Sequence, residues 1–165
     1  MILFILDGYN VIHKIPELQF SSPGGLRRSR EALIDYLAAR RARWSEAYEM
    51  LVVFDAQKGP VDQLRRLSVK GIDIHYTDPG MEADDLIIEE VRLKHQKQKI
   101  TVVSDDNRIG NNIRAYKAKL LKVAQFVNLL NPVKFNGNPT TGKGSHKINS
   151  IDGGDITTEL EKLWK

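Results

Sequence analysis

Acidic residues lie at three comparable places along the chain. Asp7 directly follows the first predicted strand, and Asp105 follows the fourth. Asp84 and Asp85 lie at the start of the helix predicted before that fourth strand. Because the carboxyl ends of parallel strands meet at one edge of a sheet, these distant carboxylates can converge there. Converging carboxylates repel one another and need a cation, and their hard oxygens suit Mg²⁺ or Mn²⁺. Such a site can polarise a phosphodiester and activate water for attack on it.

Each acid also has a simpler interpretation. An aspartate after a strand commonly serves a turn or caps a helix, and Asp84 and Asp85 would favour a helix N-terminus without any metal. Successive helical residues point about 100° apart, so at most one of this pair is expected to be a direct ligand. The set of three positions therefore carries more weight than any one acid.

Strand and helix patterns alternate along the chain. Buried or alternating apolar runs predict strands over 2–6, 51–54, 72–76, 100–103 and 119–122. Apolar spacings of three and four predict helices over 26–48, 61–67, 82–95, 109–116 and 124–130. Prolines and glycines predict a loop between the first strand and the first helix. This alternation predicts a single α/β domain, with a parallel sheet of about five strands and helices on both faces.

The composition changes near residue 131. Residues 1–131 carry the strand and helix patterns, whereas 132–154 are rich in Asn, Gly, Thr and Ser without periodicity and predict a polar flexible arm. Apolar residues in 155–165 predict a short C-terminal helix. Within the arm, 137–144 resemble a phosphate-binding loop, but Gly144 occupies the Ser/Thr position and no helix pattern follows.

The overall composition excludes several classes of protein. The 165 residues include no cysteine, which excludes disulfide scaffolds, thiolate metal sites and thiol catalysis. The longest apolar runs are far shorter than the roughly 20 residues of a membrane span. The first residues lack the basic start of a signal peptide, so we expect a cytoplasmic protein with no membrane association. A G-x-G-x-x-G motif is absent, which disfavours a dinucleotide oxidoreductase.

Basic residues are concentrated in two stretches. Residues 27–43 contain six arginines against two acids, and 92–122 contain nine Lys and Arg against two acids. The formal net charge is +4. A basic body with a few gathered carboxylates is what a metal-dependent enzyme acting on a polyanion would need. An ordinary solvated surface explains the same charges equally well.

Four motifs in a fixed order sharpen this interpretation. The first is Asp7-Gly8-Tyr9-Asn10 after its apolar run, and the others cover residues 52–56, 82–85 and 102–105. Together they resemble the YacP-like branch of the NYN domains, which are nucleases related to the PIN superfamily. The resemblance covers about residues 1–130.

This resemblance implies a PIN-like fold and a divalent-metal-dependent endoribonuclease, with mRNA as the substrate and the ribosome as a partner. Asp7, Asp84 and Asp105 match the metal-binding acids, with Mg²⁺ or Mn²⁺ as the ion, and Asp85 is a further candidate. Asn10 matches a polar residue that braces Asp7 or a metal-bound water.

The roles of several neighbouring residues stay open. Asp55 has either a supporting role behind the ligands or a plain turn role, and Asp106 is expected to face solvent or cap a helix. Tyr9 either stacks on a base or packs in the core. The histidines show no metal-ligand spacing. The residues expected to contact RNA, or alternatively to form ordinary solvated faces, are Arg27, Arg28, Arg30, Lys58, Arg65, Arg66, Arg108 and Arg114.

Two other functions compete with the endoribonuclease. One is a non-catalytic module that binds RNA or the ribosome on the same fold. The other is a phosphatase or exonuclease that uses the same metal chemistry. Clustered carboxylates facing phosphates bring a pure RNA-binding module no benefit, and this favours catalysis.

Overall fold

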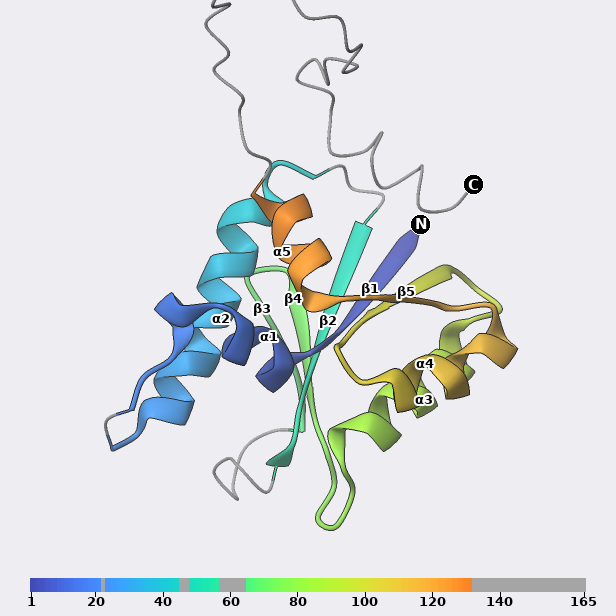
Figure 1. Ribbon diagram of the computed structural model, residues 1–165, viewed down its shortest axis with the longest axis horizontal. Helices are drawn as coiled ribbons and strands as arrows, with labels where there is room; N and C mark the ends of the chain where they lie inside the picture. Colours follow the sequence, from blue (N-terminus) through green and yellow to red (C-terminus); the bar gives the residue numbers. More distant parts are fainter. Residues whose placement is uncertain (22, 45–47, 57–64, 132–165) are drawn as a thin grey trace, which may run out of the picture.

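The computed structural model describes residues 1–21, 23–44, 48–56 and 65–131. In these residues a single sheet runs through the molecule in the order β3-β4-β2-β1-β5-β6 (Figure 1). Neighbouring strands are parallel except for the antiparallel pair β3–β4. The strands are β1 (Ile2–Asp7), β2 (Tyr48–Phe54), β3 (Arg66–Val69), β4 (Ile72–Tyr76), β5 (Lys99–Val103) and β6 (Lys119–Leu121).

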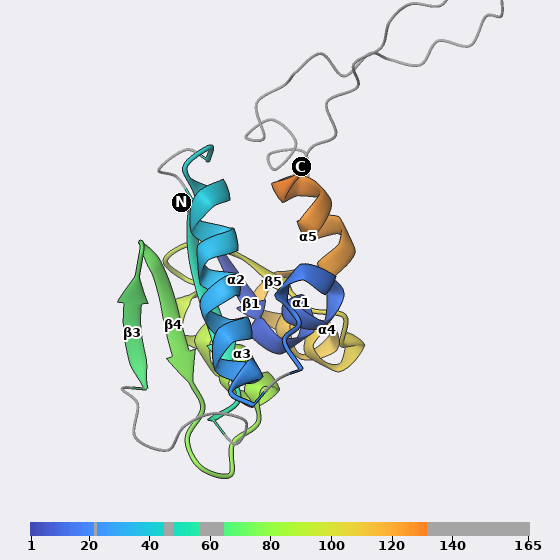
Figure 2. The ribbon, with the colours of Figure 1, turned by 90° about the vertical axis from the view of Figure 1, so that its left-hand side faces the viewer.

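Helices cover both faces of this sheet. The helices are α1 (Gly8–Lys14), α2 (Gly25–Arg41), α3 (Ala83–Lys94), α4 (Asn107–Ile113) and α5 (Val123–Leu130), with 3₁₀ turns η1 (Pro16–Leu18) and η3 (Arg114–Tyr116). Helices α1, α2 and α5 lie on one face, and α3 and α4 lie on the other (Figures 1 and 2). The predicted α/β fold with two helical layers is confirmed.

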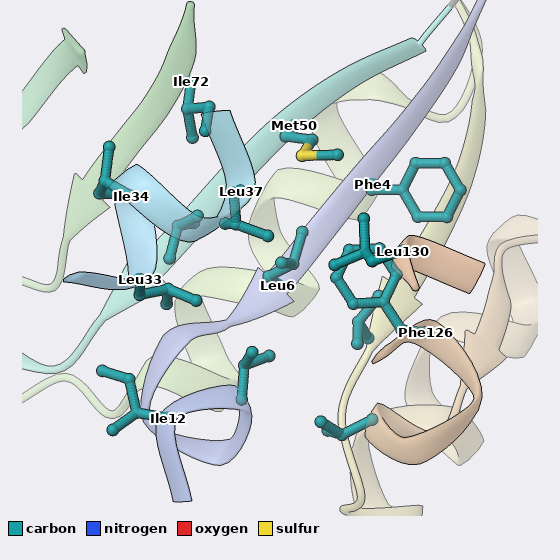
Figure 3. Close-up of a cluster of buried hydrophobic side chains, with 14 of the residues drawn as sticks. Phe4, Leu6, Ile12, Leu33, Ile34, Leu37, Met50, Ile72, Phe126 and Leu130 are labelled. Carbon is teal, nitrogen blue, oxygen red and sulfur yellow. The ribbon is translucent and has the colours of Figure 1, made fainter. Parts of the chain in front are cut away.

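The alternation of side chains along β1 divides the core into two parts. Phe4 and Leu6 point to the face covered by α1, α2 and α5 (Figure 3). Leu3 and Ile5 point to the opposite face, against α3 and α4. All four are buried. A strand that is apolar on both sides is typical of a central parallel strand, and β1 indeed lies between β2 and β5.

Helix α1 replaces the start of the predicted loop. The chain passes from β1 directly into this helix because Asp7 caps it, its carboxylate accepting a hydrogen bond from the Asn10 backbone N–H. Gly8 is required at the turn, since a Cβ there would lie 2.3 Å from Cε1 of the Phe54 ring. The prolines and glycines that suggested a loop begin only after α1 ends.

The helix predicted over 61–67 is wrong in its described part. Arg66–Val69 instead form β3, a strand in addition to the five that were predicted, and it pairs with β4 as a hairpin. The turn uses Lys70 and Gly71, whose φ angles of 53° and 76° match a two-residue hairpin connection. Residues 57–64 lie outside the described part of the chain.

The predicted helix 26–48 ends earlier than expected, at Arg41. Tyr48 instead opens β2, where it pairs with Ile2 of β1. The predicted arm at 132–154 and the predicted C-terminal helix at 155–165 lie outside the described residues, so the domain limits stay predictions. In the part of the chain that the structure describes, no helix combines the length and apolar character needed to cross a membrane.

The order of the strands places a crevice at one edge of the sheet. From β1 the chain moves outward to β2 on one side, and later reaches β5 on the other side. The carboxyl ends of β1 and β5 therefore border the point where the strand order reverses, which is where α/β sheets bind their ligands. Asp7 ends β1, and residues 104–106 follow β5.

Candidate active site at the carboxyl edge of the sheet

Asp7 is held rigidly at the junction of β1 and α1. Its side chain is almost fully buried, at 6% exposure. Besides capping α1, it accepts a hydrogen bond of 2.5 Å from Nδ2 of Asn10. The same Nδ2 lies 3.3 Å from Oγ of Ser104, which follows β5. Asn10 therefore fixes the orientation of the Asp7 carboxylate and joins the ends of β1 and β5.

Asp84 reaches the same edge from the first turn of α3. Its side chain is 17% exposed, and its Oδ2 lies 3.0 Å from Nη2 of Arg108. Burial, the neighbouring carboxyl group of Asp106 and the charge of Asp7 together raise the pKa of Asp84 to about 6, whereas Arg108 opposes the increase. This shift reflects first the burial of the carboxylate and then the neighbouring acids, whose effect one arginine does not cancel.

A pocket of about 410 Å³ lies at this edge. It receives carboxylates from three separate segments: Asp7 from β1, Asp55 from the end of β2, and Glu82 with Asp84 from the start of α3. The other residues that line the pocket are Tyr9, Asn10, His13, Gly80 and Ala83. Asp85 is exposed and does not line it. The structure therefore brings together Asp7, Asn10 and Asp84 from the predicted set.

Asp105 does not face this pocket. Its Oδ1 accepts a hydrogen bond from the backbone N–H of Val123, the first residue of α5, at 3.1 Å. Its Oδ2 lies 3.3 Å from Nζ of Lys14 in α1. The carboxylate thus links α1 to the N-terminus of α5, where a negative charge is stabilising.

Asp106, the next residue, does not line the pocket either. Asp106 caps α4, one of the two roles expected from the sequence, by accepting a hydrogen bond from the Arg108 backbone N–H at 2.7 Å. Its carboxylate is also close enough to Asp84 to raise the pKa of that residue. Of the two neighbouring acids, Asp106 is therefore the one that acts on the pKa of Asp84.

The donor set at the pocket fits a hard divalent cation. Asp7 and Asp84 offer carboxylate oxygens, the ligands that Mg²⁺ and Mn²⁺ prefer. The raised pKa of Asp84 is what a cation between these groups would relieve. Within the described residues, however, the side chains do not assemble a group of three acidic or histidine ligands around one point.

His13 is a pocket residue that the sequence interpretation missed. It lies three residues after Asn10 on α1, so both side chains share one face of that helix. The spacing could have revealed it, but only once residues 8–14 were recognised as helical. His75, by contrast, lies on β4 and pairs with Glu90 at 2.9 Å.

The predicted RNA-contacting residues are dispersed. Arg108 lies beside the pocket and bridges Asp84 and Glu82. Arg65 pairs with Asp78 at 3.2 Å, and Arg66 with Glu90 at 3.3 Å. Arg114 lies in the turn after α4, and Lys58 is outside the described residues. Of these five, the structure places Arg108 against the carboxylates.

Comparisons with known proteins agree with this architecture. The family model of the YacP-like NYN domain matches residues 4–162. Two crystal structures of Rae1 (YacP) from Bacillus subtilis are similar to the chain at 21% sequence identity. One has a TM-score of 0.65, covering 79% of this chain and 74% of that one. The other, a W164L mutant, has a TM-score of 0.62, covering 79% and 75%. The comparison with curated proteins gave no match.

Proposed function

Because the chain belongs to the YacP-like NYN domain family, we propose that it is a divalent-metal-dependent endoribonuclease. The observation that carries the proposal is the convergence of Asp7 and Asp84 at the carboxyl edge of the sheet, with the pKa of Asp84 raised to about 6. Perturbed carboxylates in a cleft are typical of functional sites. Membership in a nuclease family and a basic surface support RNA as the substrate.

Asp7 and Asp84 would hold the metal, Mg²⁺ or Mn²⁺. When bound, such an ion polarises the scissile phosphodiester and lowers the pKa of a water molecule that attacks it. Asn10 keeps the Asp7 carboxylate in one orientation through its hydrogen bond, so little reorganisation is needed when the cation enters. Arg108, next to Asp84, is positioned to contact the phosphate of the RNA.

The third metal-binding acid in this proposal differs from the one expected from the sequence. Asp105 was the predicted ligand, but its carboxylate contacts Lys14 and the α5 backbone. We therefore assign the third carboxylate to Asp106, which adjoins Asp84. Asp105 then has an indirect role, because it holds α1, and with it Asn10, against α5.

Translating mRNA with the ribosome as a partner is the specific substrate that the family resemblance favours. The non-catalytic RNA- or ribosome-binding module remains the competing function. The two differ in what the carboxylates do, since a binding protein would lose affinity through acids that face phosphates.

The decisive experiment is incubation of the purified protein with a long structured RNA in Mg²⁺ or Mn²⁺, beside an Asp84→Asn variant. A matched circular RNA separates an endonuclease from an exonuclease, and translating ribosomes are added in a parallel reaction. We expect the wild type to cleave and the variant to be inactive. Binding of RNA without cleavage in every reaction would contradict the proposal and favour the binding module.

A further inference from the structure

A second hollow, of about 590 Å³, lies between α2 and the β3–β4 hairpin. Helix α2 packs along β4 on this side of the sheet (Figure 2). The floor of the hollow is apolar, with Ile34 from α2, Leu67 and Val69 from β3, and Ile74 from β4. Its volume is within the range of sites that bind small organic molecules. The proposed cleavage chemistry makes no use of this groove.

A row of aromatic rings connects the groove to the acidic pocket. Tyr9 lines the pocket, whereas Phe54 and Tyr76 line the groove. The Tyr9 and Phe54 rings meet edge to face at 5.3 Å, and Phe54 stacks on Tyr76 at 5.7 Å. The two hollows therefore share this row of rings as a wall.

Arg30 is a buried cation in this shared wall. It is 4% exposed, and its Nη1 lies 3.1 Å from the hydroxyl oxygen of Tyr9. Its guanidinium carbon lies 6.0 Å from the centre of the Tyr76 ring, and the residue lines the groove. A buried guanidinium held in a single position is already organised for a ligand and loses little freedom on binding.

The rim of the groove carries charges of both signs. Arg27 pairs with Glu31 at 2.9 Å, and Lys70 pairs with Asp35 at 2.5 Å. All four side chains are more than half exposed, so the pairs are weak and can exchange partners. The cations suit a phosphodiester oxygen, and the carboxylates can accept hydrogen bonds from the N–H groups of a base.

These features together select the kind of ligand. A wholly apolar ligand would make no use of the charged rim, and inorganic phosphate would leave the apolar floor uncovered. A nucleotide matches both parts, with a flat base on the floor and a phosphodiester at the rim. We infer that the groove between α2 and the β3–β4 hairpin binds one unstacked nucleotide of a single-stranded RNA whose backbone continues into the acidic pocket.

This inference takes its substrate class from the proposed function, but binding tests it without cleavage. A short fluorescein-labelled single-stranded RNA is titrated with full-length protein in EDTA, and affinity is read from fluorescence anisotropy. Val69→Trp fills the groove from an edge strand, and Arg27→Glu reverses a rim charge. Arg92→Glu is the matched control, since Arg92 also pairs with a glutamate on its own exposed helix face, that of α3.

We expect each groove variant to weaken RNA binding about tenfold, the scale of one lost base contact. The control should stay within about twofold of the wild type, as expected for an exposed ion pair. Photocrosslinking with RNA that contains 4-thiouridine gives an independent readout on the unaltered protein. We expect crosslinks within residues 27–35 or 67–76.

The inference is overturned if both groove variants bind RNA as the wild type does, or if crosslinks occur only outside these two segments. It is also overturned if sedimentation shows wild-type dimers that Val69→Trp dissociates, because the groove would then hold a second copy of the chain. Cleavage is scored separately in Mg²⁺. If the wild type cleaves RNA and the groove variants bind RNA normally, the inference about the groove alone is refuted. If RNA binding depends on the groove but no cleavage occurs, the proposed catalysis alone is refuted.

Discussion

Helix α3 carries two sheltered carboxylates whose pKa values move in opposite directions. The pKa of Asp84, in the first turn, rises to about 6, whereas that of Glu90, further along the helix, falls to about 2. Burial alone raises both values. The difference therefore comes from the neighbours, and it separates a carboxylate that awaits a cation from one that already has its partners.

The neighbours of Glu90 are all cationic or can become so. The Glu90 side chain is 1% exposed, and it contacts Nδ1 of His75 at 2.9 Å, Nζ of Lys94 at 3.1 Å and Nη2 of Arg66 at 3.3 Å. Asp84 is influenced by one cation, Arg108, but also by the carboxylates of Asp106 and Asp7. The negative charge of Glu90 is thus balanced by its neighbours, whereas that of Asp84 is not.

The largest effect that we expect is a loss of cleavage activity on substitution of Asp84 but not of Glu90. Asp84→Asn should reduce metal-dependent RNA cleavage by about a hundredfold or more, because it removes a charged ligand from the pocket. The free energy of unfolding in EDTA should not fall, because the substitution relieves repulsion from Asp7 and Asp106. Single-turnover cleavage and urea unfolding measure the two quantities. Equal losses of activity and stability would contradict the distinction.

The converse change should affect stability rather than chemistry. Glu90→Gln leaves His75, Lys94 and Arg66 without the buried carboxylate, and we expect a loss of about 3 kcal/mol in the free energy of unfolding. At a temperature where the variant is folded, its cleavage rate should match that of the wild type. A large loss of cleavage with unchanged stability would place Glu90 in the catalytic machinery instead.

In EDTA, Glu90 and Asp84 should change the free energy of unfolding with pH in opposite directions. Because the pKa of Glu90 is about 2 when folded and ordinarily 4.5, its contribution is complete above pH 4.5 and disappears as the pH falls toward 2. This loss amounts to at most about 3 kcal/mol. Asp84 acts in the opposite sense, because its ordinary pKa of 3.8 rises to about 6. Its carboxylate destabilises the fold above pH 6, and this penalty is absent below pH 3.8.

The same two variants test these slopes. Glu90→Gln should flatten the stability profile between pH 4.5 and 2. Asp84→Asn should remove the opposite contribution, the loss of stability as the pH rises from 3.8 to 6. Profiles that keep the wild-type shape in both variants would show that other groups dominate the titration.

The smallest effect concerns the neighbouring acids after β5. Asp105→Asn weakens the pair with Lys14 and the capping of α5, and should cost about 1 kcal/mol of stability. Asp106→Asn should bring the pKa of Asp84 closer to 3.8, since it removes one of the charges that raise it. NMR titration of the Asp84 carboxyl carbon checks this change. A shift of that pKa in Asp105→Asn but not in Asp106→Asn would reverse the two assignments.

The sequence predicted the parts of the fold that depend on long apolar runs. Residues 3–7 and 100–103 are buried on both faces, and such runs have few alternatives to a central parallel strand. Helix α1 was missed because it depends on a side-chain cap at Asp7 rather than on periodicity. Strand β3 was missed because its alternating pattern is short and half exposed at the sheet edge.

For the candidate site, the sequence indicated which residues lie at the edge of the sheet, but not the direction in which each side chain points. The sequence placed Asp7, Asn10 and Asp84 at one edge, because the topology brings the ends of parallel strands together. It favoured Asp105 over Asp106 as the third ligand, because the direction in which each carboxylate points cannot be read from the sequence. Nor could it foresee that Lys14 and the start of α5 would engage Asp105, since these contacts form only in the folded chain.

The central position of β1 has a consequence for how the molecule is made. This strand is synthesised before its neighbour β5, which comes from residues 99–103. Pairing of β1 with β5, and with it the bridge from Asn10 to Ser104, must wait until most of the domain has left the ribosome. A nascent chain that has not yet exposed β5 therefore lacks the bridge beside Asp7, and the hydrolytic activity proposed here would begin only after that strand has been added.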